Sequence, residues 1–130
     1  MKSVVICSSN RFAKEARAFA RGLEKLGITV YVAHYYRSSG GNWSKIADFD
    51  KQFVALGLTL DHFYKIRMAD VVLVYNKDGY AGNSTSMEIG YAVALDKPIY
   101  AVSDKDDDPC RAVLFRGVVK SPRNFLRFLK

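Results

Sequence analysis

Short apolar runs alternate with amphipathic stretches along the first third of this chain. The run at residues 2–7 ends at a Ser-Ser-Asn turn, and apolar residues then recur three and four positions apart from Phe12 to Leu26. That spacing places them on one face of a helix, which Gly27 is expected to end. Residues 28–33 are rich in β-branched side chains and predict a second strand. The chain therefore begins as strand, helix, strand.

The alternation continues through the rest of the chain. A polar loop is predicted over residues 34–48, and apolar residues from Phe53 to Phe63 then predict an amphipathic helix that ends near Ala69. Residues 70–75 (DVVLVY) form an almost continuous apolar run, which is typical of a strand buried on both faces of a parallel sheet. The remaining predicted elements are a helix from about Ser84 to Leu95, a strand at 99–102, a short helix opened by Pro109, a brief strand at 118–119 and a helix from Pro122 to Lys130.

This alternation predicts an α/β fold, a flavodoxin/Rossmann-like three-layer sandwich around a doubly wound parallel sheet of five strands. We expect the strand order 2-1-3-4-5 and a single domain over residues 1–130. In such folds, ligands bind beyond the carboxyl ends of the strands, near the switch point between strands one and three. The segments predicted to meet there are residues 7–12, residues 76–88 and the loop after His34.

Composition and charge narrow the function classes. The 130 residues are 49% hydrophobic and 25% charged, which excludes a disordered chain. No apolar run approaches the roughly 18–20 residues of a membrane span, so no membrane partner is expected. Two cysteines, Cys7 and Cys110, form no disulfide framework, which favours a cytoplasmic location. The 20 basic residues against 13 acidic ones give a net charge of +7, which favours an anionic ligand, polymeric or small.

Metal ions and nucleotide cofactors are not expected. His34 and His62 stand without cysteine or acidic partners at ligand spacing, and Cys7 is interpreted as a small buried side chain. Neither a G-x-G-x-x-G nor a Walker pattern is present. The sequence therefore points to no cofactor.

A turn of small polar residues precedes Glu88, and it has two interpretations. Backbone N–H groups and hydroxyls between Gly82 and Ser86 would converge at a helix start, which suits an anion. Alternatively, Thr85 and Glu88 form a capping box in which Glu88 returns to the Thr85 amide. Spacing alone leaves both interpretations open.

Three separated motifs resemble one family. The run M-E-I-G-Y-A-x-A-L-x-K-P around Glu88, preceded by A-D-V-V-L-V-Y, resembles the nucleoside 2-deoxyribosyltransferase superfamily, which includes deoxynucleoside 5′-monophosphate N-glycosidases. The stretch C-S-S-N-R at residues 7–11 resembles the turn after strand one in those N-glycosidases. Asp61 stands nine residues before Asp70, the spacing at which the family keeps a second acid. The motifs occur in the family order over most of residues 3–103.

The resemblance implies an enzyme that cleaves or exchanges the N-glycosidic bond of a nucleoside or nucleoside 5′-monophosphate. Glu88 would be the nucleophile, and Asp61 the second carboxyl that orients the sugar or assists protonation of the base. Family members complete their pockets across subunits, so a homo-oligomer is also implied. No cofactor is implied, and the partner is a small nucleoside or nucleotide.

The resemblance also suggests how the substrate is held. Ser9 and Arg11 match the turn that binds a 5′-phosphate in the N-glycosidases. Gly82 stands six residues before Glu88, where transferases carry an aspartate for the free 5′-OH, and this favours the hydrolase branch. The predicted substrate-binding residues are Ser9, Arg11, Gly82, Asn83, Ser84 and Ser86.

Two other functions remain open. The first is a nucleotide sensor that keeps the pocket without catalysis. The second is a nucleic-acid-binding module, because the last twenty residues contain no acid, although no RNA-recognition or helix-turn-helix pattern is present. Trp43, Tyr35 and Tyr36 either stack on a base or anchor their loop. The basic residues of the carboxyl-terminal segment are Arg111, Arg116, Lys120, Arg123, Arg127 and Lys130.

Overall fold

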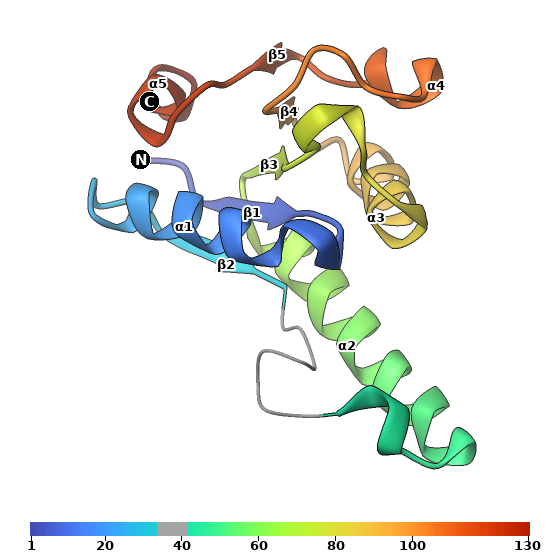
Figure 1. Cartoon of the computed structure of the whole chain (residues 1–130). Helices are drawn as coiled ribbons and strands as arrows, with labels where there is room; N and C mark the ends of the chain where they lie inside the picture. Colours follow the sequence, from blue (N-terminus) through green and yellow to red (C-terminus); the bar gives the residue numbers. More distant parts are fainter. Residues whose placement is uncertain (34–41) are drawn as a thin grey trace.

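A parallel β-sheet runs through the centre of the protein, whose computed structural model describes residues 1–33 and 42–130 (Figure 1). Within these ranges the sheet has five strands in the order β2-β1-β3-β4-β5, and each neighbouring pair is parallel. The strands are β1 (Val4–Cys7), β2 (Val30–Val32), β3 (Val71–Val74), β4 (Ile99–Ala101) and β5 (Gly117–Val118). The α/β fold and the strand order predicted from the sequence are confirmed.

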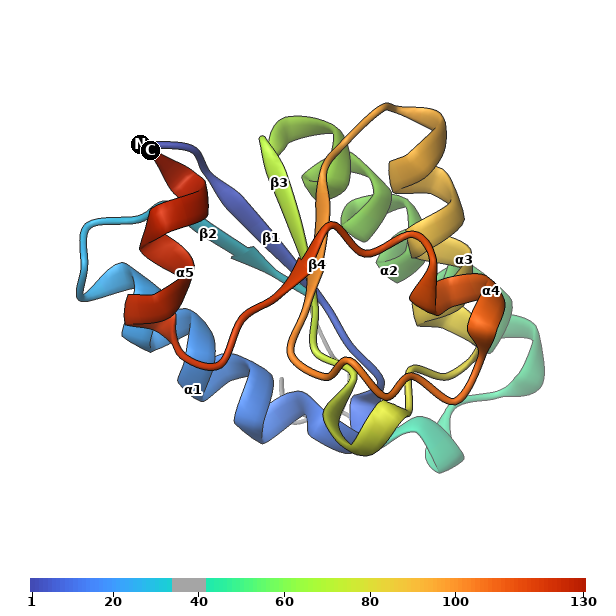
Figure 2. The same ribbon diagram turned by 90° about the horizontal axis from the view of Figure 1, so that it is seen from above.

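Helices cover both faces of the sheet (Figure 2). Helices α1 and α5 pack on one face, and α2 and α3 pack on the other. The helices are α1 (Ala13–Glu24), α2 (Asp48–Met68), α3 (Asn83–Ala94), α4 (Pro109–Ala112) and α5 (Pro122–Leu129), with short 3₁₀ turns η1 (Asn10–Phe12), η3 (Trp43–Lys45) and η4 (Lys77–Gly79). The two chain ends lie side by side, and the Lys2 amide donates to the Leu129 carbonyl at 2.9 Å. None of the described helices combines the length and apolar character that crossing a lipid bilayer requires.

The side chains of β1 alternate between the two helical layers. Val4 and Ile6 pack with α1 and α5, whereas Val5 and Cys7 pack with α2 and α3. All four are at most 1% exposed, as expected for a central strand of a parallel sheet. Cys7, the last residue of β1, therefore belongs to the α2–α3 layer at the carboxyl edge of the sheet.

Short polar signals set the ends of several helices as predicted. Gly27 has a φ of +83°, a left-handed conformation that glycine adopts without strain after the end of α1. At the other end of the chain, the Ser121 hydroxyl accepts a hydrogen bond from the Asn124 amide at 3.0 Å, and Pro122 follows at the first helical position. These signals confirm the predicted starts and ends of α1 and α5 to within a few residues.

Helix α2 differs from its prediction in the side that it buries. Phe53, Leu56 and Leu60 of the predicted apolar stripe are each 55% exposed, and the buried residues of the helix are His62 and Ile66. The amino-terminal half of α2 extends away from the sheet in Figure 1, so only its carboxyl-terminal half has strands to pack against. The stripe is therefore an outer surface in this single chain.

Candidate functional site

A cavity of about 590 Å³ opens at the carboxyl ends of β1 and β3, in the layer of α2 and α3. Its walls come from residues 8–10 after β1, from residues between 55 and 62 of α2, and from residues between 80 and 88 around the start of α3. Ala33 and Trp43 complete the lining. The segments that the sequence predicted to meet after strands one and three do meet here.

Glu88 faces this cavity from the second turn of α3. Its side chain is 14% exposed, and its Oε2 has no hydrogen-bond partner among the described residues. The alternative capping box is not formed, because Gly82 is the N-cap of α3 and Thr85 lies inside the helix. The Thr85 hydroxyl is also unpaired within the described part of the chain. Glu88 is thus not used in capping, and its side chain borders the cavity.

Two buried side chains from other elements approach Glu88. The Nε2 atom of His62, on α2, lies 3.4 Å from Glu88 Oε2 and 3.3 Å from Cys7 Sγ at the end of β1. Cys7 is fully buried and His62 is 3% exposed. From the sequence, His62 is expected to be isolated and Cys7 to be a packing residue. In the fold, the histidine has a cysteine and an acid as neighbours, which corrects that interpretation.

Burial controls the protonation of this cluster. It raises the pKa of Glu88 from 4.5 to about 7, against a smaller lowering by a hydrogen bond with the Cys7 thiol. Burial also lowers the pKa of His62 from 6.5 to about 4, and nearby Lys65 adds to this lowering. Between about pH 4 and pH 7 the proton therefore resides on Glu88 while His62 is neutral. Their 3.4 Å contact joins two neutral groups in that range.

The start of α3 suits an anionic group. Gly82 has a φ of +83°, and no side chain from the described ranges caps the helix, so its first backbone N–H groups are left to a ligand. Asn83 and Ser84 line the cavity at this point. A Cβ atom on Gly82 would lie 3.7 Å from Ser9, so the start of α3 and the turn after β1 are close neighbours.

The two residues predicted to hold a phosphate lie differently from each other. Ser9 lines the cavity, and its hydroxyl accepts a hydrogen bond from the Arg11 amide at 3.2 Å. Arg11 is not part of the lining. Its guanidinium lies 3.7 Å above the ring of Tyr80, which does line the cavity. Ser9 can therefore contact a ligand directly, whereas Arg11 reaches the rim through Tyr80.

Asp61 does not reach the cavity. Its side chain is 46% exposed, and its Oδ2 lies 2.7 Å from Nζ of Lys65. Neighbouring residues of a helix point about 100° apart, so with His62 directed at Glu88, Asp61 is directed elsewhere. Asp61, expected beside Glu88, is not among the residues that line the cavity, and the next residue, His62, is the one that contacts Glu88.

Ser86 is also displaced from its predicted role. Its hydroxyl donates to the Gly82 carbonyl at 2.7 Å and accepts a hydrogen bond from Arg111 at 3.1 Å. Arg111 in turn contacts Asp106 at 2.7 Å. Ser86 therefore ties the start of α3 to α4, and it is not a lining residue.

Cavity residues that the sequence analysis did not select include Thr59, His62 and Tyr80. A signal for the first two existed, because small or polar side chains recur four and three positions apart on α2 at Ala55, Thr59 and His62. This signal is weaker than the one from the larger apolar side chains of the exposed stripe. Trp43, considered as a base-stacking residue, lines the cavity; His34, Tyr35 and Tyr36 lie outside the described residues.

One group of residues could hold a metal ion. Cys7, His62 and Glu88 each offer one ligand atom, and these atoms lie within 4.8 Å of one another, the only such group found in residues 1–33 and 42–130. A second cavity, of about 570 Å³, lies on the other side of the sheet and is lined partly by Lys77 and Lys105. Its described lining contains no buried carboxyl or imidazole group, so the cavity at Glu88 is the candidate active site.

Comparison with protein-family models finds no match, and comparison with curated proteins finds none either. The family expected from the motifs therefore rests on the residues of this chain alone.

Proposed function

We propose that this protein cleaves the N-glycosidic bond of a nucleoside 5′-monophosphate, with Glu88 as the attacking carboxylate. One observation carries the proposal. Glu88 is only 14% exposed, borders a cavity of the size that holds small ligands, and is not used in capping α3. The motif resemblance to the nucleoside 2-deoxyribosyltransferase superfamily supports the same residue.

The chemistry follows from the carboxylate. The Glu88 carboxylate approaches C1′ of the sugar, and the C1′–N bond breaks. The electron pair of that bond leaves with the base, and the base takes up a proton. The carboxylate stabilises the oxocarbenium-like sugar or bonds to C1′. Water then adds at C1′ and loses one proton, which balances the proton taken up by the base; the sugar phosphate is released and the Glu88 carboxylate is regenerated. Hydrolysis is preferred to base transfer because Gly82 replaces the aspartate that would hold a free 5′-OH.

The surroundings of Glu88 assign roles to its neighbours. His62 lies against the carboxyl group and is neutral above about pH 4. It therefore positions Glu88 without placing a second positive charge beside the sugar, which itself becomes positive during the reaction. The uncapped start of α3 and the Ser9 hydroxyl are placed to bind the phosphate. Charge-assisted contacts of this kind contribute about 1.5–3 kcal/mol each, so a phosphate should improve kcat/KM by roughly tenfold or more.

The deciding experiment offers the protein a panel of nucleosides and their 5′-monophosphates and detects free base by chromatography. We expect base release from monophosphates, and its loss in Glu88→Gln with the fold retained. Glu24→Gln, an exposed glutamate on α1, is the matched control and should not change turnover. Unchanged turnover in Glu88→Gln would show that Glu88 is not the attacking carboxylate. Nucleotide binding without base release from any substrate would instead identify a sensor.

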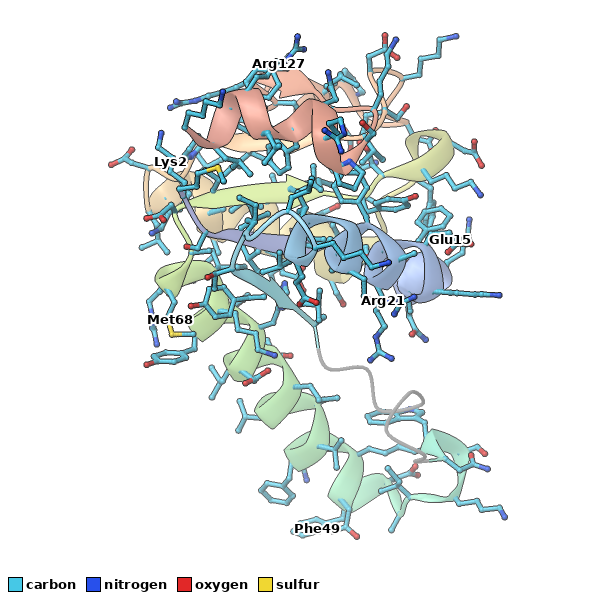
Figure 3. The ribbon with its side chains drawn as sticks, turned by 90° about the vertical axis from the view of Figure 1, so that its left-hand side faces the viewer. Lys2, Glu15, Arg21, Phe49, Met68 and Arg127 are labelled. Atoms are coloured by element: carbon cyan, nitrogen blue, oxygen red, sulfur yellow. The ribbon has the colours of Figure 1, made fainter. Side chains whose placement is uncertain are left out.

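We further propose that the active species is a homo-oligomer in which α2 of one copy packs against α2 of another. Phe49 lies at the end of α2 that projects from the sheet in Figure 3 and is 68% exposed. Phe53, Leu56, Leu60 and Tyr64 continue the same side of the helix, each 53–55% exposed. Five large exposed apolar side chains along one side of a helix are a candidate interaction surface. The opposite side of α2 lines the cavity, so a second copy would pack directly behind the site.

A second candidate function is binding of a polyanion such as single-stranded nucleic acid. The observation that favours it is that α1 and α5 pack on the same face of the sheet, and both helices carry exposed basic residues. Arg21 of α1 and Arg127 of α5 are labelled in Figure 3. The exposed basic residues are Lys14 and Arg21 of α1, Lys25 directly after it, and Arg123, Arg127 and Lys130 at the carboxyl terminus. This basic face lies across the sheet from the cavity at Glu88.

A further inference from the structure

We propose that Cys7, His62 and Glu88 form a binding site for a thiophilic divalent cation such as Zn²⁺, and that occupation of this site blocks the glycosidase reaction. The binding stands on the geometry of the three side chains alone. The block rests on the proposed function of Glu88, and the two are tested separately below.

The spacing of the three ligand atoms fits a zinc ion. Zinc bonds of about 2.0–2.3 Å at tetrahedral angles place neighbouring ligand atoms about 3.4–3.6 Å apart. His62 Nε2 lies 3.3 Å from Cys7 Sγ and 3.4 Å from Glu88 Oε2. All three atoms lie within 4.8 Å of one another, so only small side-chain rotations are needed to enclose an ion.

The ligand types select the class of cation. A thiolate and an imidazole bind Zn²⁺ and similar transition metals, whereas Mg²⁺ and Ca²⁺ require oxygen ligands. On binding, the Cys7 thiol and, where it is protonated, the Glu88 carboxyl each release a proton to solvent. One thiolate, one carboxylate and one divalent cation then form a unit of zero net charge, which tolerates a buried position.

The position of the cluster gives the ion both a route and an open coordination site. Cys7 and His62 are buried, whereas Glu88 borders the cavity and is 14% exposed. An ion that enters the cavity meets Glu88 first, and the three protein ligands leave its fourth coordination position to water or another ligand. A bound ion would hold the Glu88 oxygen that is unpaired in the described chain, and the carboxylate could then no longer approach C1′.

The binding test uses the full-length, reduced protein and Co²⁺ or Zn²⁺ as the probe. The chain has two cysteines, so Cys110→Ser leaves Cys7 as the only thiol. We expect the Cys110→Ser protein to bind one Co²⁺ with a cobalt–thiolate charge-transfer band, because only Cys7 can produce it. Zn²⁺ should displace the cobalt, with one equivalent detected by calorimetry. Absence of the band in this variant, or binding only to the exposed Cys110 of the natural sequence, overturns the proposal.

Ligand substitutions supply the second arm. Cys7→Ser and His62→Gln should each weaken Zn²⁺ binding by at least about tenfold, since even changes behind a ligand cost about 10–100-fold. Circular dichroism verifies that each variant folds. Binding equal to that of the natural sequence in both folded variants contradicts the site.

The block is measured on base release. Zn²⁺ should inhibit turnover of the natural sequence, a chelator should restore it, and Cys110→Ser should be inhibited to the same extent. Full turnover with the site loaded refutes the block. One-to-one Zn²⁺ binding by a protein that releases no base from any nucleotide would refute the proposed function and leave the metal site intact.

Discussion

At the scale of single residues, the protonation of Glu88 governs the proposed reaction. Burial raises its pKa to about 7, and only the ionised carboxylate can attack C1′. We therefore expect kcat/KM for base release to fall about tenfold for each pH unit below pH 7 and to level off above it. A pH profile recorded with a chelator present measures this. A profile that is flat from pH 5 to pH 8 would show that Glu88 is not the group that must ionise.

The same residue should lower stability at high pH. The folded chain binds the Glu88 proton more tightly than the unfolded chain, so stability falls as pH rises from 4.5 to about 7. His62 acts in the opposite direction between about pH 4 and 6.5, because its folded pKa is lowered. Above pH 7 only the free-energy cost of burying the ionised Glu88 carboxylate remains. Glu88→Gln should then raise the free energy of unfolding by about 1–3 kcal/mol at pH 8, and by much less at pH 4.5.

Denaturant titrations at the two pH values measure this difference, with Glu24→Gln as the control. An equal effect of Glu88→Gln at both values would mean that the gain comes from packing and not from the removal of a buried charge.

Single-residue predictions led to cavity-lining residues where a local motif carried them. Glu88, Gly82 and Ser9 line the cavity because short turns after β3 and β1 fix their positions. Asp61 and His62 are adjacent on α2, and their side chains point in different directions. Which of them points to the cavity depends on which side of the helix packs against the sheet. The spacing of apolar residues predicted that the side of α2 with the large apolar side chains would be buried. The sequence therefore could not show which of the two adjacent residues faces the cavity.

At the scale of elements, the contact between α1 and α5 depends on one glycine. A Cβ atom on Gly22 would lie 2.6 Å from Cγ of Pro122, and the proline ring cannot rotate away. We expect Gly22→Ala to lower the free energy of unfolding by about 1–3 kcal/mol, despite the better helix propensity of alanine. Gly90→Ala on α3 is the matched control. Nothing lies within 4 Å of its Cβ position, so it should raise stability by about 0.5–1 kcal/mol.

Thermal unfolding of both variants decides the point. If Gly22→Ala stabilises the protein as Gly90→Ala does, α1 and α5 are not packed as closely as the structure places them.

Helix α2 makes the prediction on assembly. Lysines on its exposed stripe would place charges in the proposed interface between two copies. Leu56→Lys combined with Leu60→Lys should weaken association by at least about thirtyfold, because two large side chains lose their burial. Val113→Lys, at a position that is 79% exposed near α4, is the control and should leave the oligomer unchanged. Light scattering coupled to gel filtration measures the mass. A natural sequence that is already monomeric at high concentration contradicts the proposal.

Elements were predictable where local signals and burial agreed. Strands β1 and β3 are apolar on both faces and lie at the centre of the sheet, so their sequences identify them directly. Helix α2 has its larger apolar side chains on the outside, and no periodicity can distinguish a core from an interface between copies. Its existence was therefore predictable from sequence, whereas its orientation depended on the rest of the fold.

At the scale of the whole molecule, the sheet separates two surfaces of different character. The cavity with Glu88 lies in the α2–α3 layer, and the exposed basic residues of α1 and α5 lie in the other layer. The net charge of +7 is therefore not concentrated at the candidate active site alone. A small phosphate and a polymeric anion would use different sides of the protein.

This separation predicts that polyanion binding and base release are independent. Arg123→Gln with Arg127→Gln removes two exposed cations of α5. Each phosphate contact to a single strand contributes about 0.7 to the slope of log K against log salt, so the slope for a single-stranded oligonucleotide should fall by about 1.4. Fluorescence anisotropy over a salt series measures the slope, and kcat/KM for the best monophosphate should stay within twofold, about 0.4 kcal/mol. A parallel loss of base release would show that the substrate binds on the basic face. An unchanged slope would show that these two arginines of α5 do not contact the polyanion.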